Sequence, residues 1–418
     1  MPAAATAVAV AAAVADAHRR EWGLVLAATV RVARDLDLAE ECVQDAYAEA
    51  LRVWPSTGAP ASPGAWLTTV ARRKAWDALR RTATHERVLP RLVVEDVPEH
   101  HDVPDDRLRL IFTCCHPALA AEARVALTLR LLCGLTTAEV ARAFLVSEPT
   151  MAARITRAKK KIAAARIPYR IPSADDLPDR IDAVLDVVRL VHTTGHTAPT
   201  GDVLVRTDLT DRALELARLL RRLLPSDARV AALLATLLFH HSREATRVDA
   251  DGELVLLADQ DRTRWDAAEI AEGTALVREA LRGRPVSRFA LEAAIAAVHA
   301  EADRFEDTDW REIVALYTLL RRAAPSPVVD LNRAVAVAFA VGPEAGLAEL
   351  DRLAAEPALA GYGYLAASRA DLLRRLGRTD EARTAYEEAL HLTTNAVERR
   401  FLARRLASLP TAGSAATP

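Results

Sequence analysis

The sequence predicts an all-α protein that is divided into several helical domains. The chain of 418 residues is longer than one ordinary core, because domains usually contain about 100 to 200 residues. Its apolar residues recur at helical spacing, and almost no stretch alternates apolar and polar residues as a half-buried strand would. Clusters that contain Pro and Gly interrupt this pattern. We therefore expect small helical domains in series.

The first domain is expected to span residues 10–82. Helical periodicity covers residues 11–54, a breaker cluster follows at residues 55–60, and a second helical run occupies residues 63–81. An aromatic ring can stack on an unpaired base for about 1–3 kcal/mol, so the tryptophans and basic residues of this run suit a melted DNA strand. The candidate side chains are Trp66, Thr69, Arg72, Arg73, Lys74, Trp76 and Arg80. Alternatively, at least one of the two tryptophans is a core residue.

An acidic linker is predicted over residues 83–106, which have little periodic apolar content. Its acidic residues include Glu95, Asp96, Glu99, Asp102, Asp105 and Asp106. A second small helical domain is expected over residues 107–167, followed by a Pro-rich linker over residues 168–178.

The second domain carries a local excess of positive charge that the formal net charge of −2 does not reveal. Residues 121–170 contain ten Lys and Arg against three Glu. Such a basic patch is typical of a surface that meets phosphates.

The second domain contains the pattern of a helix-turn-helix. Thr136 and Glu139 have the spacing of a capping box at the start of a short helix. After a tight turn, Ser147 can cap the next helix, and Pro149 is tolerated in its first turn. This next helix is expected over residues 148–165.

The predicted second helix of the motif has one apolar and one polar face. Its apolar stripe consists of Met151, Ile155, Ala158 and Ile162. A helix that enters a major groove needs hydrogen-bond donors for base edges and phosphates. The candidate donors are Ser147, Thr150, Arg154, Arg157, Lys160 and Lys161. Helical hairpins with basic faces are also common as solvated surfaces, which is the alternative interpretation.

Taken together, these segments resemble the extracytoplasmic-function sigma factors, which are DNA-binding subunits of bacterial RNA polymerase. The resemblance covers about the first 170 residues. Residues 38–47 are similar to the helix that docks on the clamp of the largest polymerase subunit, and residues 65–81 and 147–161 to the helices that read the minus-ten and minus-thirty-five elements. The acidic segment would be the linker between the two promoter-binding domains. The implied contacts with core polymerase are Glu40, Glu41, Gln44 and Asp45.

A helical extension resembling tetratricopeptide (TPR) repeats is predicted over residues 179–409. Residues 363–390 are close to one TPR hairpin, and such a repeat buries its apolar side only by stacking on neighbours. Together with residues 106–117 and 135–146, this extension resembles the subgroup of these sigma factors that carries a TPR-like C-terminal α-solenoid. That resemblance covers nearly the whole chain and implies regulation through an unidentified protein partner. A disordered tail is expected over residues 410–418.

No catalytic or metal-binding motif stands out in the sequence. A Gly-rich phosphate loop, a nucleophile elbow and a metalloprotease pair are all missing. The four cysteines form no CxxC pair, so we interpret them as buried thiols. His192 and His196 could form a metal pair, but no carboxylate motif lies near them in the sequence. We therefore predict a protein that is not an enzyme and needs no cofactor or metal.

The N-terminal apolar run, residues 3–15, is shorter than the about 20 residues that a membrane span requires. We expect a cytoplasmic alternative sigma factor that binds core RNA polymerase and promoter DNA, without a membrane partner. Two other hypotheses remain. The chain could be a helix-turn-helix regulator that never joins polymerase, or a TPR scaffold whose basic helices contact another protein.

Overall fold

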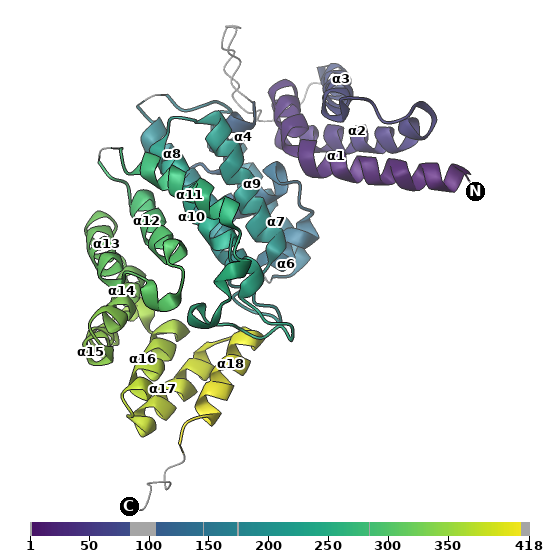
Figure 1. Cartoon of the computed structure of the whole chain (residues 1–418). Helices are drawn as coiled ribbons and strands as arrows, with labels where there is room; N and C mark the ends of the chain where they lie inside the picture. The colour runs from purple at the N-terminus through teal and green to yellow at the C-terminus, as the bar shows by residue number, and fades with distance from the viewer. Residues whose placement is uncertain (1, 84–105, 145, 174, 284, 411–418) are drawn as a thin grey trace, which may run out of the picture. The chain divides into compact units, whose positions relative to one another are not determined.

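The computed structural model describes residues 2–83, 106–144, 146–173, 175–283 and 285–410. Across these residues the chain forms eighteen α-helices and no β-strand, which confirms the predicted all-α fold (Figure 1). The chain divides into two compact units, Met1–Leu190 and Val191–Pro418. The predicted acidic linker, except for its two end residues, and the predicted tail beyond residue 410 lie outside the described residues.

Three helices form the first part of the N-terminal unit: α1 (Pro2–Ala33), α2 (Leu36–Thr57) and α3 (Pro63–Ala83). Each contacts the other two. Their shared core includes the buried side chains Trp22, Leu26, Val43, Trp54 and Leu67. Among the described helices, none is both long and apolar enough to cross a membrane.

Two helix ends differ from the sequence-based expectation. The helix α1 begins at Pro2 rather than near residue 11, because its first residues are mostly alanine, the strongest helix former. The helix α2 continues through Pro55 to Thr57, since a proline in the last turn removes only one backbone hydrogen bond. Gly58, with a φ angle of 77°, then ends the helix and donates its N–H to the carbonyl oxygen of Trp54 at 2.9 Å.

Shorter helices make up the second part of the N-terminal unit. They are α4 (Asp106–Cys114), α5 (Ala121–Leu127), α6 (Thr137–Phe144) and α7 (Glu148–Ala164), with a π-helical turn, η1 (Thr128–Leu132), directly after α5. All four cysteines are buried free thiols, as predicted. Burial raises the pKa of Cys42 and of Cys115 to about 11, so both thiols stay protonated at neutral pH.

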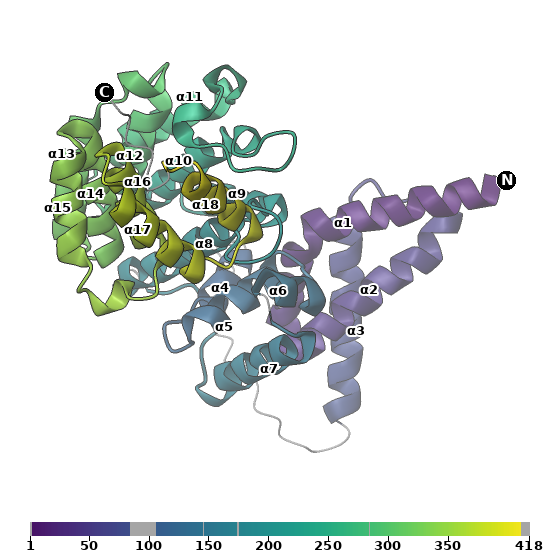
Figure 2. The same cartoon turned by 90° about the horizontal axis from the view of Figure 1, so that it is seen from below.

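The C-terminal unit is a series of helices in which, from α9 onward, each helix packs against the next (Figures 1 and 2). The helix α8 (Leu177–His196) enters it, and the hairpin expected over residues 363–390 forms as α16 and α17. Stacked helix pairs of this kind build an α-solenoid. The series consists of α9 (Thr207–Leu223), α10 (Ala228–His241), α11 (Ala267–Ala280), α12 (Arg288–Glu301), α13 (Trp310–Ala323), α14 (Pro327–Ala340), α15 (Pro343–Leu353), α16 (Gly363–Arg375), α17 (Thr379–Leu392) and α18 (Ala396–Ala407).

One buried side chain ties the end of this series to its beginning. Asn395, between α17 and α18, donates its amide N–H groups to the carbonyl oxygens of Ala198 and Val203, each at 2.9 Å. Its side-chain oxygen accepts the N–H of Val397 at 2.9 Å and so caps α18. Asn395 therefore joins segments that lie 197 positions apart in the sequence.

Replacing Asn395 with Ala should lower the free energy of unfolding of the C-terminal unit by about 2–3 kcal/mol. The substitution removes a helix cap, typically about 1 kcal/mol, and leaves two carbonyl groups without their donor. Urea unfolding of the full chain, followed by circular dichroism, measures the change. The matched control is Glu388→Ala at an exposed position of α17, which should leave stability unchanged. Equal stability of both variants would contradict the closing role of Asn395.

Candidate nucleic-acid interface

Local caps hold the helix-turn-helix in place. The backbone N–H of Thr136 donates to the Glu139 carboxylate at 2.7 Å, and the N–H of Glu139 donates to the Thr136 hydroxyl at 3.2 Å, which confirms the predicted capping box. Partial burial raises the pKa of Glu139, but the hydrogen bonds from Thr136 and the charges of Arg142 and His18 together lower it by more, so the carboxylate stays ionised. Ser147 caps α7 by accepting the N–H of Thr150 at 3.3 Å, also as predicted.

The helix α7 separates its apolar and polar residues as the sequence indicated. Met151, Ile155, Ala158 and Ile162 are buried, which confirms the apolar stripe. Arg154 is half-buried, and its guanidinium carbon lies 5.6 Å from the ring centre of Phe144. The other five candidate donors are exposed: Ser147, Thr150, Arg157, Lys160 and Lys161. One face of α7 therefore exposes a row of hydroxyl and basic side chains to which a ligand can bind.

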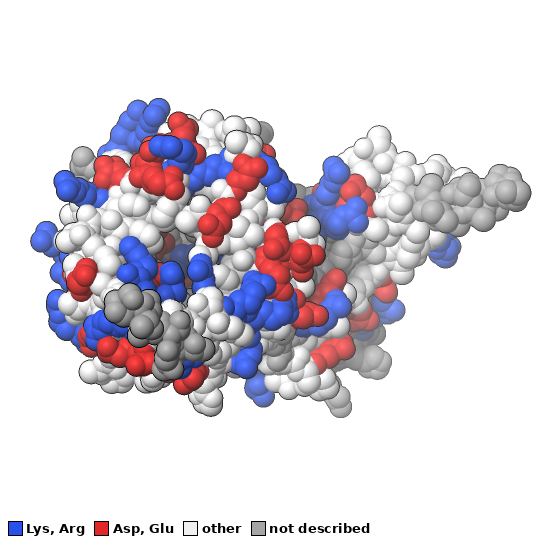
Figure 3. Space-filling view, turned by 60° about the horizontal axis from the view of Figure 1, so that its bottom comes forward, with Lys and Arg blue, Asp and Glu red and all other residues white. Residues whose placement is uncertain are grey.

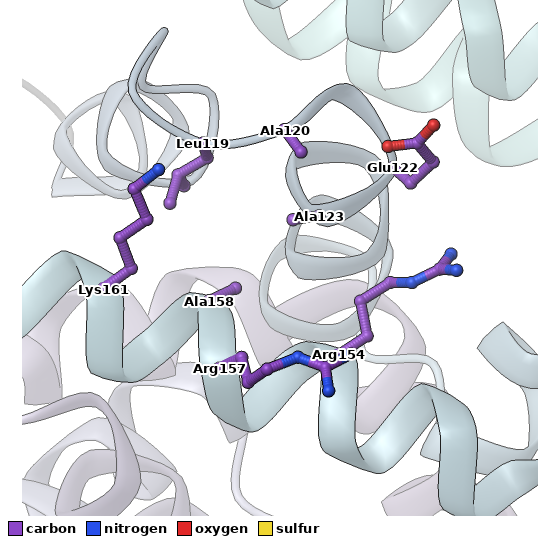
Figure 4. Close-up of a pocket in the computed structure, with 8 residues that line it drawn as sticks. All are labelled: Leu119, Ala120, Glu122, Ala123, Arg154, Arg157, Ala158 and Lys161. Carbon is purple, nitrogen blue, oxygen red and sulfur yellow. The ribbon is translucent and has the colours of Figure 1, made fainter.

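A pocket of about 290 Å³ lies between α7 and the start of α5 (Figure 4). Three cationic side chains of α7 line it, Arg154, Arg157 and Lys161, against a single carboxylate, Glu122 of α5. The remaining lining residues are Leu119, Ala120, Ala123 and Ala158. Figure 4 shows Arg154 and Glu122 at one end of the pocket and Lys161 at the other, beside Leu119. This excess of positive charge suits a phosphate group of a nucleic-acid backbone.

The helix α3 also presents a basic face with an aromatic residue. Trp76 is 54% exposed, which is unusual for a tryptophan. By their helical spacing, four other exposed residues lie on the same side of α3 as Trp76: Thr69, Arg72, Arg73 and Arg80. Trp66 is instead half-buried and meets the ring of Trp54 edge-on, with ring centres 5.6 Å apart. One of the two tryptophans thus belongs partly to the core, as expected.

Lys74 is half-buried, unlike the exposed arginines of α3, of which Arg73 also lies 3.7 Å from Glu49. The ammonium nitrogen of Lys74 lies 3.3 Å from a carboxylate oxygen of Glu49 and 3.7 Å from one of Asp45, both on α2. The residue is therefore directed toward α2 and ties the two helices together. It does not extend the exposed basic face.

The four residues predicted to contact polymerase do not share one surface. Glu41, Gln44 and Asp45 are exposed on α2, and Asp37, which the sequence analysis did not select, is exposed one turn before Glu41. The spacing of Asp37, Glu41 and Gln44 places them in one stripe, and this i, i+4, i+7 pattern is the signal that could have identified Asp37. Glu40 is buried instead, because neighbouring residues on a helix point in directions about 100° apart.

Glu40 is held inside the N-terminal unit by two cations. Arg130 of η1 lies 2.8 Å from one carboxylate oxygen, and Lys159 of α7 donates to the other. Lys159 also donates to Asp37 at 2.6 Å. Burial lowers the pKa of Lys159, but the charges of Glu40 and Asp37 and the hydrogen bonds to them together raise it by more, so the ammonium stays charged. The motif helix α7 is thus joined to α2 through side chains that sequence spacing does not relate.

Two segments of the chain match known families. Residues 18–84 match the model of sigma-70 region 2, and residues 109–162 match that of sigma-70 region 4. The chain belongs to the sigma-70 family. Sigma-70 regions 2 and 4 are DNA-binding domains of transcription initiation factors, which act with RNA polymerase. The exposed faces of α3 and α7 lie in the parts of the sigma factor that match these two regions.

The rest of the sigma factor has relatives of undefined role. Residues 180–281 match a family of unknown function, DUF6596. Over 391 residues, the sigma factor is 44% identical to an uncharacterised protein of Rhizobium meliloti (strain 1021), a match that covers 91% of this chain and 92% of that protein. The two proteins therefore share the sigma regions and the C-terminal extension. No solved structure matches the sigma factor.

Proposed function

We propose that this protein is an alternative sigma factor of the extracytoplasmic-function type, which binds core RNA polymerase and directs it to a specific set of promoters. The observation that carries this proposal is the pair of exposed basic faces on α3 and α7, in segments that match regions 2 and 4. In this role α3 holds the melted minus-ten strand, with Trp76 as the stacking residue. The helix α7 reads the minus-thirty-five element from the major groove.

The polymerase contact is assigned to the exposed residues of α2. Glu41, Gln44 and Asp45 offer two carboxylates and an amide to a basic partner surface, namely the clamp of the largest subunit. Glu40 serves a different purpose, since its ion pairs with Arg130 and Lys159 connect α2 to α7. A polymerase that also engaged Glu40 would first have to separate these two helices.

The C-terminal unit is proposed to regulate the sigma factor through protein contacts, as a TPR-like α-solenoid. The consecutive packing of α9 to α18, and the hairpin of α16 and α17 above all, supports this part of the proposal. Solenoids of helical hairpins commonly bind peptides or helices of other proteins. The partner is then an unidentified regulatory protein. As a subunit of RNA polymerase, the sigma factor would act in the cytoplasm.

The test is transcription from a pool of promoter fragments by purified bacterial core polymerase and the full chain. The double substitution Glu41→Ala, Gln44→Ala should weaken binding to core polymerase by more than about tenfold and reduce transcripts accordingly, while the fold stays intact, because both side chains are exposed. The control Arg264→Ala, at an exposed position of the C-terminal unit, should transcribe normally. If the unaltered chain binds promoters but never core polymerase, the protein is a helix-turn-helix regulator. If it binds neither, the scaffold hypothesis takes its place.

A further inference from the structure

Three histidines gather inside the C-terminal unit. His192 and His196 lie one turn apart on α8, and His240 joins them from the end of α10. One ring nitrogen from each histidine lies within 4.8 Å of those of the other two. The ring centres are 4.9 to 5.3 Å apart, and His192 is only 4% exposed. Only the pair on α8 is visible in the sequence, because no local spacing connects it to His240, 44 positions further on.

Each of the three rings has a buried nitrogen that lacks a hydrogen-bond partner among the described residues. These atoms are Nε2 of His192, Nδ1 of His196 and Nδ1 of His240. Buried polar atoms nearly always have a partner, and leaving one without any costs about 1–3 kcal/mol. Three neighbouring rings that each hold such an atom indicate a ligand that accepts their lone pairs.

The histidines are also in the protonation state that a metal ion requires. Burial is the largest cause that lowers the pKa of each ring, for His192 to about 3, and the charges of Arg243 and Arg247 are among the smaller causes. All three are therefore neutral at physiological pH. Neutral imidazole is the form that coordinates metals, since the lone pair is then free.

We propose that His192, His196 and His240 form a binding site for one divalent transition-metal ion, with Zn²⁺ as the best fit. Two histidines at i and i+4 on one helix face, completed by a third, are an established way to hold zinc with an open fourth position. Bonds of about 2.0–2.1 Å place tetrahedral ligand atoms about 3.4 Å apart. Metal binding therefore requires side-chain rotations that shorten the present spacing of up to 4.8 Å to that value.

The charges around the cluster define the fourth ligand. Arg247 donates to the carbonyl oxygen of His196 and, at 3.1 Å, to the hydroxyl of Thr197, and Arg243 approaches Gln260 at 3.5 Å. Neither arginine forms a salt bridge with a carboxylate in the described part of the chain. Two such cations oppose a bare dication and favour an anion on the open position, such as hydroxide or a carboxylate. Figure 3 shows a hollow with basic side chains beside it on the face that it draws.

Metal titration of the full chain tests the proposal. After treatment with a chelator, the protein should bind one Zn²⁺ per chain in calorimetry, and Co²⁺ should give the visible absorption of a four-coordinate site. The single substitutions His196→Gln and His240→Gln should each weaken binding by more than about tenfold. His391→Gln, at an exposed position of α17, is the matched control and should bind like the unaltered protein.

Circular dichroism of each variant shows whether it is folded, and Zn²⁺ should raise the melting temperature of the unaltered protein but not that of the two cluster variants. The proposal is wrong if the unaltered protein binds no ion, or if folded His196→Gln and His240→Gln variants bind as tightly as the control. These readouts involve no DNA or polymerase. The metal site and the sigma function can therefore fail independently.

Discussion

Replacing Glu40 with Ala is expected to lower the free energy of unfolding of the N-terminal unit by about 3–5 kcal/mol. The carboxylate lies between Arg130 and Lys159, and all three side chains are largely buried, with exposed fractions of 7%, 15% and 11%. Removal of the anion leaves Arg130 without its counter-charge and Lys159 with only the exposed carboxylate of Asp37. Urea unfolding, followed by tryptophan fluorescence, measures the loss, because Trp22 and Trp54 belong to the core of this unit.

Two further variants separate the ion pairs from general damage. Glu41→Ala changes the same residue type one position along α2, at an exposed site, and should alter stability by less than about 0.5 kcal/mol. Adding Lys159→Met to Glu40→Ala removes one of the two cations that faced Glu40 and should recover part of the loss. If Glu40→Ala and Glu41→Ala are equally stable, the contact between α2 and α7 does not hold the unit together.

Replacing both Arg154 and Arg157 with Ala is expected to weaken promoter binding by about 2–6 kcal/mol, because each base-specific arginine contact contributes about 1–3 kcal/mol. Both arginines line the pocket beside α7, and neither forms part of the helix's buried stripe. The loss should therefore appear in DNA binding and leave stability nearly unchanged. Fluorescence anisotropy with a promoter duplex, at several salt concentrations, measures both the affinity and its salt dependence.

The salt dependence distinguishes the two kinds of arginine contact. Removal of an arginine that reads a base lowers the selectivity of the protein between promoters. Removal of one that binds phosphate weakens binding to all duplexes and lowers the slope of affinity against salt concentration by about one per contact. Arg264→Ala, at an exposed position of the C-terminal unit, should leave affinity and slope unchanged. Unchanged promoter selection and salt slope in the double variant would contradict the assignment of α7 as the recognition helix.

The sequence by itself was sufficient for features that depend on neighbouring residues. The all-α class, the capping box of Thr136 and Glu139, the cap at Ser147 and the buried stripe of α7 were all predicted and are present. These features depend on side-chain periodicity and on hydrogen bonds between residues at most four positions apart. The spacing that forms them is therefore visible in the sequence. The start of α1 at Pro2, the break between α1 and α2 and the end of α2 were not predicted.

Only the tertiary structure decided which distant residues meet. Glu40 appeared to belong with its neighbours on a polymerase-facing surface, yet it pairs with Lys159, 119 positions away. His240 completes a cluster with a pair on α8, and Asn395 closes the C-terminal unit onto residues near position 200. Helix periodicity fixes the face on which a residue lies but not the helix that covers that face. Which helices meet depends on packing and loop geometry summed over the whole chain, so no local spacing reports these contacts.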